Sequence, residues 1–310
     1  MSDHSDPLID ERTIAKVDIG EAFLYHAGRN NGGSVRILLT GADGQVGQAL
    51  QQALHGEHDL LATSRATLDM SEYAAVAQVC AARPDLVIHP AAFTNVDGCA
   101  LDPPLAYRTN ALGTKHLALA CAQLDVPLVY ISTNEVFDGT AHTPYYEWDR
   151  PNPINVYAHS KWAGEQMVQQ LLRRWYIVRI AWVFGGPRNF VRTVLRLAAE
   201  RPSLSMVADE VGNPTYAPDL AEAVARLIHE PAYGVYHFTN HGHCSRYDFA
   251  AEVIRQAKLS TTLVPITLAE YPRPSTPPHF TALHNFVGAN DLGITLRPWQ
   301  EALAEFLIHR

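Results

Sequence analysis

The chain has 310 residues, of which 47% are hydrophobic and 18% are charged, and its formal net charge is −8. This composition is typical of a globular protein, and the negative charge argues against a nucleic-acid partner, because neutralising phosphates requires clustered Lys and Arg. No apolar run approaches the roughly 20 residues that span a bilayer, and the first residues lack the layout of a secretion signal. We therefore expect a cytoplasmic protein without a membrane partner.

Strand-like and helix-like segments alternate along the chain from about residue 35. Residues 1–34 are polar and end in a glycine-containing stretch, so we interpret them as an N-terminal extension outside the core fold. The alternation that follows indicates βαβ units and a parallel sheet. The predicted elements are strands at 35–39, 58–63, 85–89, 127–132 and 176–182, and helices at 45–54, 71–82, 104–124 and 160–174. The fold class is therefore α/β, with a Rossmann-type, doubly wound parallel sheet over 35–185.

The regular alternation weakens after Gly185, and prolines become frequent between residues 265 and 278. We expect residues 186–310 to form mainly a smaller, mixed substrate-binding lobe. The sequence leaves open whether elements of this part return to the Rossmann sheet. Two helices are predicted here, at 218–229 and 298–308.

A glycine-rich turn joins the first predicted strand to the first predicted helix. It contains Gly41, Gly44 and Gly47. Glycine permits the tight turn and lets backbone amides approach a pyrophosphate at the helix N-terminus. The spacing alone also occurs in ordinary strand-to-helix turns, but its place on the first strand of a βαβ series favours a dinucleotide site. Gln45 and Val46 complete the predicted cofactor loop.

The residues after the second predicted strand bear on the choice of cofactor. An acidic residue that binds an adenosine ribose is expected about 20 residues past the glycines, where Ser64 and Arg65 stand instead. The guanidinium of Arg65 suits a 2′-phosphate, so NADPH is favoured and NADH is the alternative. Arg65 could equally be a solvated loop residue. Asp69 offers a carboxylate to the adenine amino group, and Met70 offers an apolar wall to its ring.

Tyr157 and Lys161 are spaced by one helical turn, which places both side chains on one face of a helix. A nearby ammonium stabilises a phenolate and lowers the pKa of the tyrosine toward the working range. Tyr157 could then donate its proton to a carbonyl oxygen while hydride reaches the carbon. This spacing occurs by chance in many helices. It gains weight here because Ser132 and Thr133 end the preceding strand, where a hydroxyl could hydrogen-bond the same oxygen.

Together these segments resemble the extended short-chain dehydrogenases and, within them, the dTDP-4-dehydrorhamnose reductase family. The resemblance runs from about Val35 to the C-terminal helix. The motifs that carry it are Gly-Ala-Asp-Gly-Gln-Val-Gly (41–47), Pro-Ala-Ala-Phe-Thr-Asn-Val-Asp (90–97), Ser-Thr-Asn-Glu-Val-Phe-Asp-Gly (132–139), Pro-Ile-Asn-Val-Tyr-Ala-His-Ser-Lys-Trp-Ala-Gly-Glu (153–165), Arg-Ile-Ala-Trp-Val-Phe-Gly (179–185) and Gly-Asn-Pro-Thr (212–215).

The resemblance implies roles for particular residues. Thr133, Tyr157 and Lys161 would be the catalytic hydroxyl, the acid and the cation that tunes it. Ala91 and Ala92 would line the cofactor, Tyr157 and Lys161 would also bind it, and Asn110 would support the active-site backbone. The implied substrate-binding residues are Thr94, Val96, Thr133, Asn134, Glu135, Tyr157 and Trp182. Trp182 would pack its indole against the sugar ring, with a core position as the alternative.

Two departures from the family pattern concern the substrate side. The family usually has Asp-Tyr where this chain has Asn134 and Glu135, and it usually has a late Arg-Pro pair that residues 276–281 lack. A missing cation would weaken the binding of a nucleotide diphosphate unless another residue substitutes, and Arg273 and His279 are the candidates. These changes leave the hydride chemistry intact but leave the sugar open.

The function implied is NAD(P)H-dependent reduction of the 4-keto group of a nucleotide-linked 6-deoxy sugar, with dTDP-4-dehydro-L-rhamnose as the first substrate to consider. One alternative is a reductase or epimerase of another nucleotide sugar. Another is a non-catalytic subunit similar to the regulatory beta subunit of methionine adenosyltransferase, although the complete set of catalytic residues favours an enzyme. We expect a homodimer, because dimers are the commonest soluble assembly. The cysteine spacing suggests no zinc site, and no metal is expected.

Overall fold

A six-stranded sheet lies at the centre of the computed structural model, which describes residues 34–309. The strand order is β2-β1-β3-β4-β5-β10, and every neighbouring pair is parallel. The strands are β1 (Arg36–Leu39), β2 (Asp59–Ala62), β3 (Leu86–His89), β4 (Leu128–Thr133), β5 (Trp175–Ile180) and β10 (Gly234–His237). The predicted fold class is confirmed. The predicted N-terminal extension lies outside the described residues, apart from Ser34.

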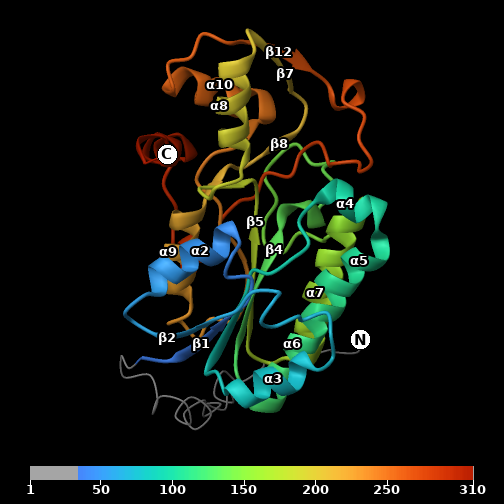
Figure 1. The fold of residues 1–310 in the computed structure, drawn as a ribbon, viewed down its shortest axis with the longest axis vertical. Helices are drawn as coiled ribbons and strands as arrows, with labels where there is room; N and C mark the ends of the chain where they lie inside the picture. Colours follow the sequence, from blue (N-terminus) through green and yellow to red (C-terminus); the bar gives the residue numbers. More distant parts are fainter. Residues whose placement is uncertain (1–33, 310) are drawn as a thin grey trace, which may run out of the picture. The chain divides into compact units, whose positions relative to one another are not determined.

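Helices cover both faces of this sheet (Figure 1). One face packs against α2 (Gln45–Leu54) and α9 (Ala217–Leu227), and the other against α3 (Ala75–Ala82), α6 (Gly113–Leu124) and α7 (Val156–Leu171). Successive strand residues point to opposite faces. Ile37 and Leu39 accordingly belong to the first layer of the core and Leu38 to the second. Burial on both sides explains why these strands are almost continuously apolar.

The chain changes direction across the sheet at β1. From β1 it passes to β2 on one side, and β3 then adds on the other side of β1. In sheets of this kind, ligands bind outside the carboxyl ends of the strands at such a switch point. The segments that follow β1 and β3, which begin with Thr40 and Pro90, therefore frame the expected cofactor crevice.

A smaller lobe lies beyond the carboxyl edge of the sheet (Figure 1). Its core joins Phe184, Phe249, Trp299 and Phe306. The lobe contains α8 (Phe190–Glu200), α10 (Arg246–Gln256), α12 (Trp299–Ile308) and the parallel pair β7 (Ser203–Val207) and β12 (Thr262–Ile266). The elements α9 and β10 come after residue 185 in the chain but belong to the central sheet and its helical layer. The sheet is therefore built from both predicted segments, 35–185 and 186–310. A boundary at residue 185 stays a prediction.

Short elements complete the description. The two-residue strands are β6 (Val183–Phe184), β8 (Val211–Gly212), β9 (Thr215–Tyr216) and β11 (Cys244–Ser245), the short helices are α4 (Val96–Leu101), α5 (Pro103–Tyr107) and α11 (Val287–Leu292), and there are 3₁₀ turns at Asn134–Val136 and Leu268–Glu270.

Three predicted helices differ from those observed. The helix predicted at 71–82 begins later, at Ala75. The predicted helix at 160–174 begins earlier, at Val156, because the Asn155 side chain caps it by accepting a hydrogen bond from the Ala158 amide (2.9 Å). Tyr157 thereby falls in its first turn. The predicted helix at 104–124 is interrupted by a π-helical turn at Arg108–Leu112, and such turns often occur at functional sites.

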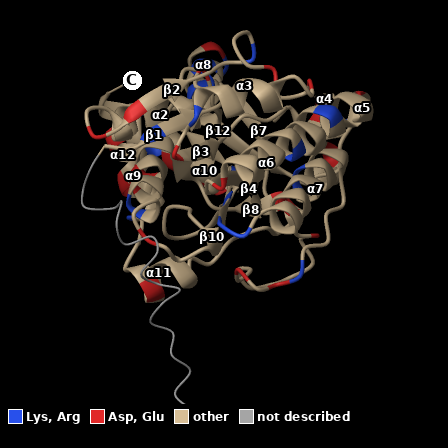
Figure 2. Ribbon diagram, turned by 90° about the horizontal axis from the view of Figure 1, so that it is seen from below, with Lys and Arg blue, Asp and Glu red and all other residues tan. Residues whose placement is uncertain are grey.

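Along the ribbon in Figure 2, Lys and Arg positions are interspersed with Asp and Glu positions. Among the helices within residues 34–309, none combines the length and the apolarity that crossing a bilayer requires.

Candidate active site

The glycine loop meets the segment after β3 at the switch point of the sheet. Gly41 has a φ of +59°, and a Cβ there would lie 2.8 Å from the Ala91 Cα. A Cβ at Gly47 would collide with the Gly41 carbonyl oxygen. Gly44 is the N-cap of α2, so no Cβ stands before the free amides of the first turn. The loop is therefore shaped for a close backbone approach to an anion at the helix N-terminus.

The remaining residues of the predicted cofactor loop support its conformation. The Gln45 side-chain oxygen accepts a hydrogen bond from the Gly186 amide (3.1 Å), which ties the loop to the chain after β6. Val46 packs against the core between α2 and the sheet. Ala91 and Ala92 are half-buried beside the loop. Their roles toward a cofactor stay predictions.

Arg65 and Asp69 lie together at the surface after β2. The Arg65 Nε stands 3.4 Å from an Asp69 oxygen, and the Arg65 side chain is 68% exposed. Hydrogen bonds from Ser71, together with Arg65, hold the pKa of Asp69 below its usual range. The side chain of Met70 is instead buried in the core with α3 and α6. The structure thus leaves Arg65 free to reach a ligand, while Met70 contributes to packing.

Thr133, Tyr157 and Lys161 occupy the carboxyl end of β4 and the first turns of α7, which pack together. Lys161 is 2% exposed, and its ammonium donates to the Ile131 carbonyl (2.7 Å) and lies 4.1 Å from the centre of the Tyr130 ring. Burial lowers the pKa of Lys161 to about 7, although the Glu165 carboxylate acts in the opposite direction.

Tyr157 is 9% exposed and packs with Val96, Cys99 and Phe93. Burial and the Glu135 carboxylate raise the pKa of Tyr157, and a hydrogen bond with Thr133 acts against them. Lys161 is not among the groups that shift this pKa, so the lowering that we expected from it is not seen in the structure. A phenol of raised pKa stays protonated but is a weaker acid than an unshifted tyrosine.

Asn110 connects the segment after β3 to helix α7. Its side chain accepts from the Phe93 amide (2.7 Å) and donates to the Phe93 carbonyl (3.1 Å) and to the Ser160 hydroxyl (2.9 Å). The π-helical turn that contains Asn110 orients these groups. Asn110 thus links the backbone beside Ala91 and Ala92 to the helix that carries Tyr157.

A buried ion pair lies behind the catalytic helix. Both Arg179 and Glu165 are nearly inaccessible, with side-chain exposures of 4% and 1%, and the guanidinium donates to the carboxylate at 2.8 and 3.0 Å. The Ser132 hydroxyl donates to the same carboxylate. Sequence reasoning quoted all three residues within motifs but assigned no partner to any of them.

The two segments that depart from the family pattern, 134–135 and 276–281, are joined by hydrogen bonds, directly or through Asn155. The Asn134 amide donates to the Thr281 hydroxyl (2.6 Å). Glu135 accepts from the Asn155 amide (2.8 Å), and Asn155 also donates to the Thr276 carbonyl (3.2 Å). The replaced residues at 134–135 and the replaced segment at 276–281 are therefore neighbours in space, and they form one altered region.

Charges of both signs lie near Glu135. Burial raises the pKa of Glu135 most and the Glu210 carboxylate also raises it, whereas the Asn155 hydrogen bond and the charges of Arg246 and Arg273 lower it. The Arg273 guanidinium pairs with Asp97 (2.9 Å), and Arg246 pairs with Glu210 (2.9 Å). Sequence reasoning named Arg273 as a candidate cation but missed Arg246 and Glu210, because neither lies in a quoted motif.

Trp182 contacts Arg246 and Gly212. The Arg246 guanidinium lies 3.6 Å from the centre of the Trp182 ring, and a Cβ on Gly212 would come within 2.8 Å of the indole. Thr94 is exposed in the loop before α4. The candidate cation His279 is 65% exposed and interacts with Asp209. Binding roles for Thr94, Val96 and Trp182 stay predictions.

Comparisons with known proteins show the family of the chain. Residues 35–310 match the family model described as RmlD substrate binding domain. The chain is 38% identical to the dTDP-4-dehydrorhamnose reductase of Mycobacterium tuberculosis (strain H37Rv) over 286 residues, covering 89% of this chain and 93% of the relative. It is 36% identical over 279 residues to the spore coat polysaccharide biosynthesis protein SpsK of Bacillus subtilis, with coverages of 89% and 98%.

Solved structures give the same result. The dTDP-4-dehydrorhamnose reductase of Clostridium acetobutylicum superimposes with a TM-score of 0.87 at 39% identity, covering 88% of this chain and 99% of that one. The enzyme of Bacillus anthracis, solved in complex with NADP, also gives 0.87, at 37% identity and with coverages of 89% and 100%. The chain belongs to the dTDP-4-dehydrorhamnose reductase family.

Proposed function

We propose that this protein uses NADPH to reduce the 4-keto group of a nucleotide-linked 6-deoxy sugar, with dTDP-4-dehydro-L-rhamnose as substrate and dTDP-L-rhamnose as product. The observation that carries the proposal is the convergence of Thr133, Tyr157 and Lys161 at the carboxyl edge of the sheet that also bears the glycine loop. The relatives named for this activity and the NADP-bound structure from Bacillus anthracis support it.

The chemistry divides between the cofactor and the side chains. NADPH, when bound, supplies the hydride that is added to the carbonyl carbon. Tyr157 donates its phenolic proton to the carbonyl oxygen, and the Thr133 hydroxyl hydrogen-bonds the same oxygen. Lys161, when protonated, favours the phenolate that Tyr157 becomes. Because burial raises the pKa of Tyr157, the transfer of its proton depends on the Lys161 charge and on the negative charge that develops on the carbonyl oxygen.

The cofactor choice rests on Arg65. Its guanidinium is exposed after β2 and has only a long contact of 3.4 Å with Asp69 to give up. A fork of donors in this position suits the 2′-phosphate that distinguishes NADPH from NADH. Asp69 then stands where its carboxylate can accept from the adenine amino group. NADH is the weaker alternative.

The altered region around Asn134 and Glu135 contacts the sugar in this proposal. The Glu135 carboxylate accepts hydrogen bonds from sugar hydroxyls, and Trp182 offers the exposed part of its indole to the ring. Arg273 supplies the cation that the missing Arg-Pro pair would otherwise provide for the diphosphate, because charge-assisted bonds from arginine to phosphate are strong and directional. His279 is not needed for this task, since it faces Asp209.

One observation favours a different keto sugar as the alternative substrate. Asn134 and Glu135 replace the usual Asp-Tyr pair beside the buried Tyr157, which places a carboxylate where the family has a phenol. A different arrangement of hydroxyl groups on the 4-keto sugar would use that acceptor. The complete catalytic set argues against a purely regulatory subunit.

The test is NADPH oxidation with dTDP-, UDP- and GDP-linked 4-keto sugars, run with both nicotinamide cofactors. We expect turnover with dTDP-4-dehydro-L-rhamnose and a loss of about 10²- to 10⁴-fold in the Tyr157→Phe variant, because the transferable proton is gone while the ring remains. Cofactor affinity of that variant should be kept. Near-normal turnover by Tyr157→Phe, or no turnover of any sugar by the unaltered protein, would contradict the proposal.

We also propose that residues 35–185 bind NADPH and that residues 186–310 mainly bind the sugar, with α9 and β10 returning to the Rossmann sheet. The protein acts as a homodimer in the cytoplasm. Size-exclusion chromatography with light scattering would measure the assembly directly.

A further inference from the structure

Three potential metal ligands meet at the edge of the sheet opposite the active site. Glu57 and His58 directly precede β2, at the amino ends of the strands, and His229 follows the end of α9. The catalytic residues and the glycine loop lie at the carboxyl ends. This group is therefore separate from the site that carries the proposed reaction.

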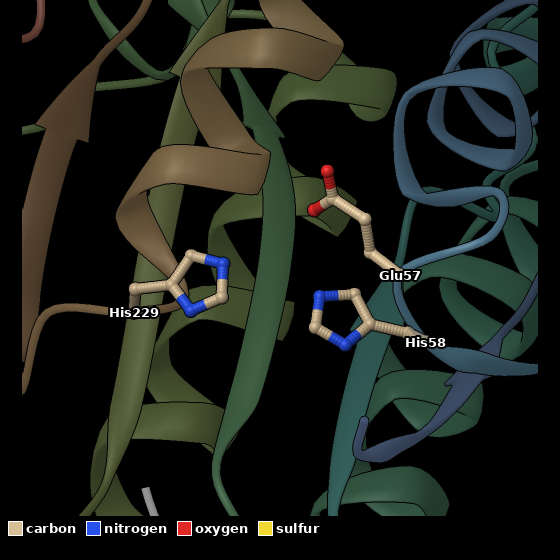
Figure 3. A group of neighbouring side chains, drawn as sticks. All are labelled: Glu57, His58 and His229. Carbon is tan, nitrogen blue, oxygen red and sulfur yellow. The ribbon is translucent and has the colours of Figure 1, made fainter. Parts of the chain in front are cut away.

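The ligand atoms of the three side chains all lie within 4.8 Å of one another. The imidazole rings of His58 and His229 are neighbours, with their centres 5.6 Å apart. The Glu57 carboxylate lies beside these two rings (Figure 3). Zinc binds imidazole nitrogen and carboxylate oxygen at about 2.0–2.2 Å. Because Glu57 and His229 are exposed, small rotations of their side chains would bring the three donors to that distance.

His58 lacks a partner that would explain its position. Both of its ring nitrogens are buried, and neither has a hydrogen-bond partner among the described residues. A buried polar group without a hydrogen-bond partner destabilises the fold. An imidazole whose nitrogens have no such partner is available as a metal ligand.

We propose that Glu57, His58 and His229 form a binding site for a divalent transition metal of the zinc type. Two imidazoles and one carboxylate are a known zinc ligand set, with water in the fourth position. Imidazole donors favour zinc over magnesium and calcium, which prefer oxygen ligands.

The metal would act on the fold rather than on the reaction. It would tie the segment between α2 and β2 to the end of α9. The helices α2 and α9 pack in the same layer of the core. A ligand that binds only the folded state stabilises it by mass action. We therefore expect zinc to raise the melting temperature of the protein without changing kcat for keto-sugar reduction.

The experiment uses tag-free, full-length protein that has been treated with a chelator. Zinc affinity is measured by competition with a chromophoric chelator, and thermal unfolding is followed with Zn²⁺, with Mg²⁺ and without metal. Glu57→Gln and His229→Gln remove one ligand each at exposed positions, so both variants should fold. His142→Gln removes an exposed histidine elsewhere and is the matched control.

We expect the unaltered protein and His142→Gln to bind zinc equally and to show the same rise in melting temperature. Losing an outer-shell partner already costs about 10- to 100-fold in metal affinity, so each ligand variant should lose at least as much, together with the temperature shift. Magnesium should have no effect. Equal zinc affinity in His229→Gln and the unaltered protein, or a zinc effect that His142→Gln removes, would overturn the proposal.

Discussion

Glu165→Ala tests the buried ion pair behind the catalytic helix. The carboxylate accepts two hydrogen bonds from Arg179 and one from Ser132, and the side chains of both charged residues are at most 4% exposed. After the change, Arg179 keeps contacts at 3.5 Å with the Glu147 carbonyl and the His237 ring, and its position 5.2 Å from the centre of the Phe137 ring. Its charge would therefore remain buried without a counter-ion.

Removing one partner of a buried pair costs about 3–5 kcal/mol, because an uncompensated charge is left in the interior. Total stabilities are of order 5–15 kcal/mol, so this loss is a large fraction of the whole. At roughly 2–4 °C per kcal/mol for a domain of this size, the melting temperature should fall by about 6–20 °C. An exposed pair such as Arg196–Glu200 should give less than about 1 kcal/mol.

Urea unfolding of Glu165→Ala, of Glu200→Ala and of the double variant Glu165→Met/Arg179→Met would measure these differences. The double variant removes both charges and fills the space with apolar atoms, so it should be more stable than Glu165→Ala. A loss below about 1 kcal/mol in Glu165→Ala, or a double variant less stable than that single variant, would refute the argument that the unpaired charge dominates.

Three further predictions concern the proposed reaction. Arg65→Ala should weaken NADPH binding by about 1.5 kcal/mol and should hardly affect NADH binding. This value is the lower end for a charge-assisted hydrogen bond, because Arg65 is exposed. Equal effects in titrations of both cofactors would exclude a contact between Arg65 and the 2′-phosphate. Glu135→Tyr should shift the ratio of kcat/KM values between two keto sugars toward dTDP-4-dehydrorhamnose, and an unchanged ratio would place Glu135 outside recognition. Since the pKa of Lys161 is about 7, its positive charge is lost as the pH rises through that value, so NADPH affinity should decline there. Lys161→Arg should flatten that decline, because arginine stays protonated, and a decline that persists in this variant would point to another group.

Much of the nucleotide-binding half follows from local sequence. The alternation of short apolar runs with helical segments, the glycines after the first strand and the spacing of Tyr157 and Lys161 each lie within a few residues, so their geometry is set by backbone preferences. Those features predicted the parallel sheet, which is confirmed, and the cofactor crevice and the catalytic pair, which stay predictions. The start of α7 was placed too late, because the cap by Asn155 depends on a side chain that precedes the apolar pattern.

The substrate side and the ion pairs were decided by tertiary structure. Contacts such as Asn134 with Thr281, Arg246 with Trp182 and Arg179 with Glu165 join residues that are far apart in the chain or on different elements. Local periodicity carries no information about such pairs, because it does not say which loops return to the same edge of the sheet. The same reason hid the Glu57, His58 and His229 group, whose members meet only once α9 has packed beside α2.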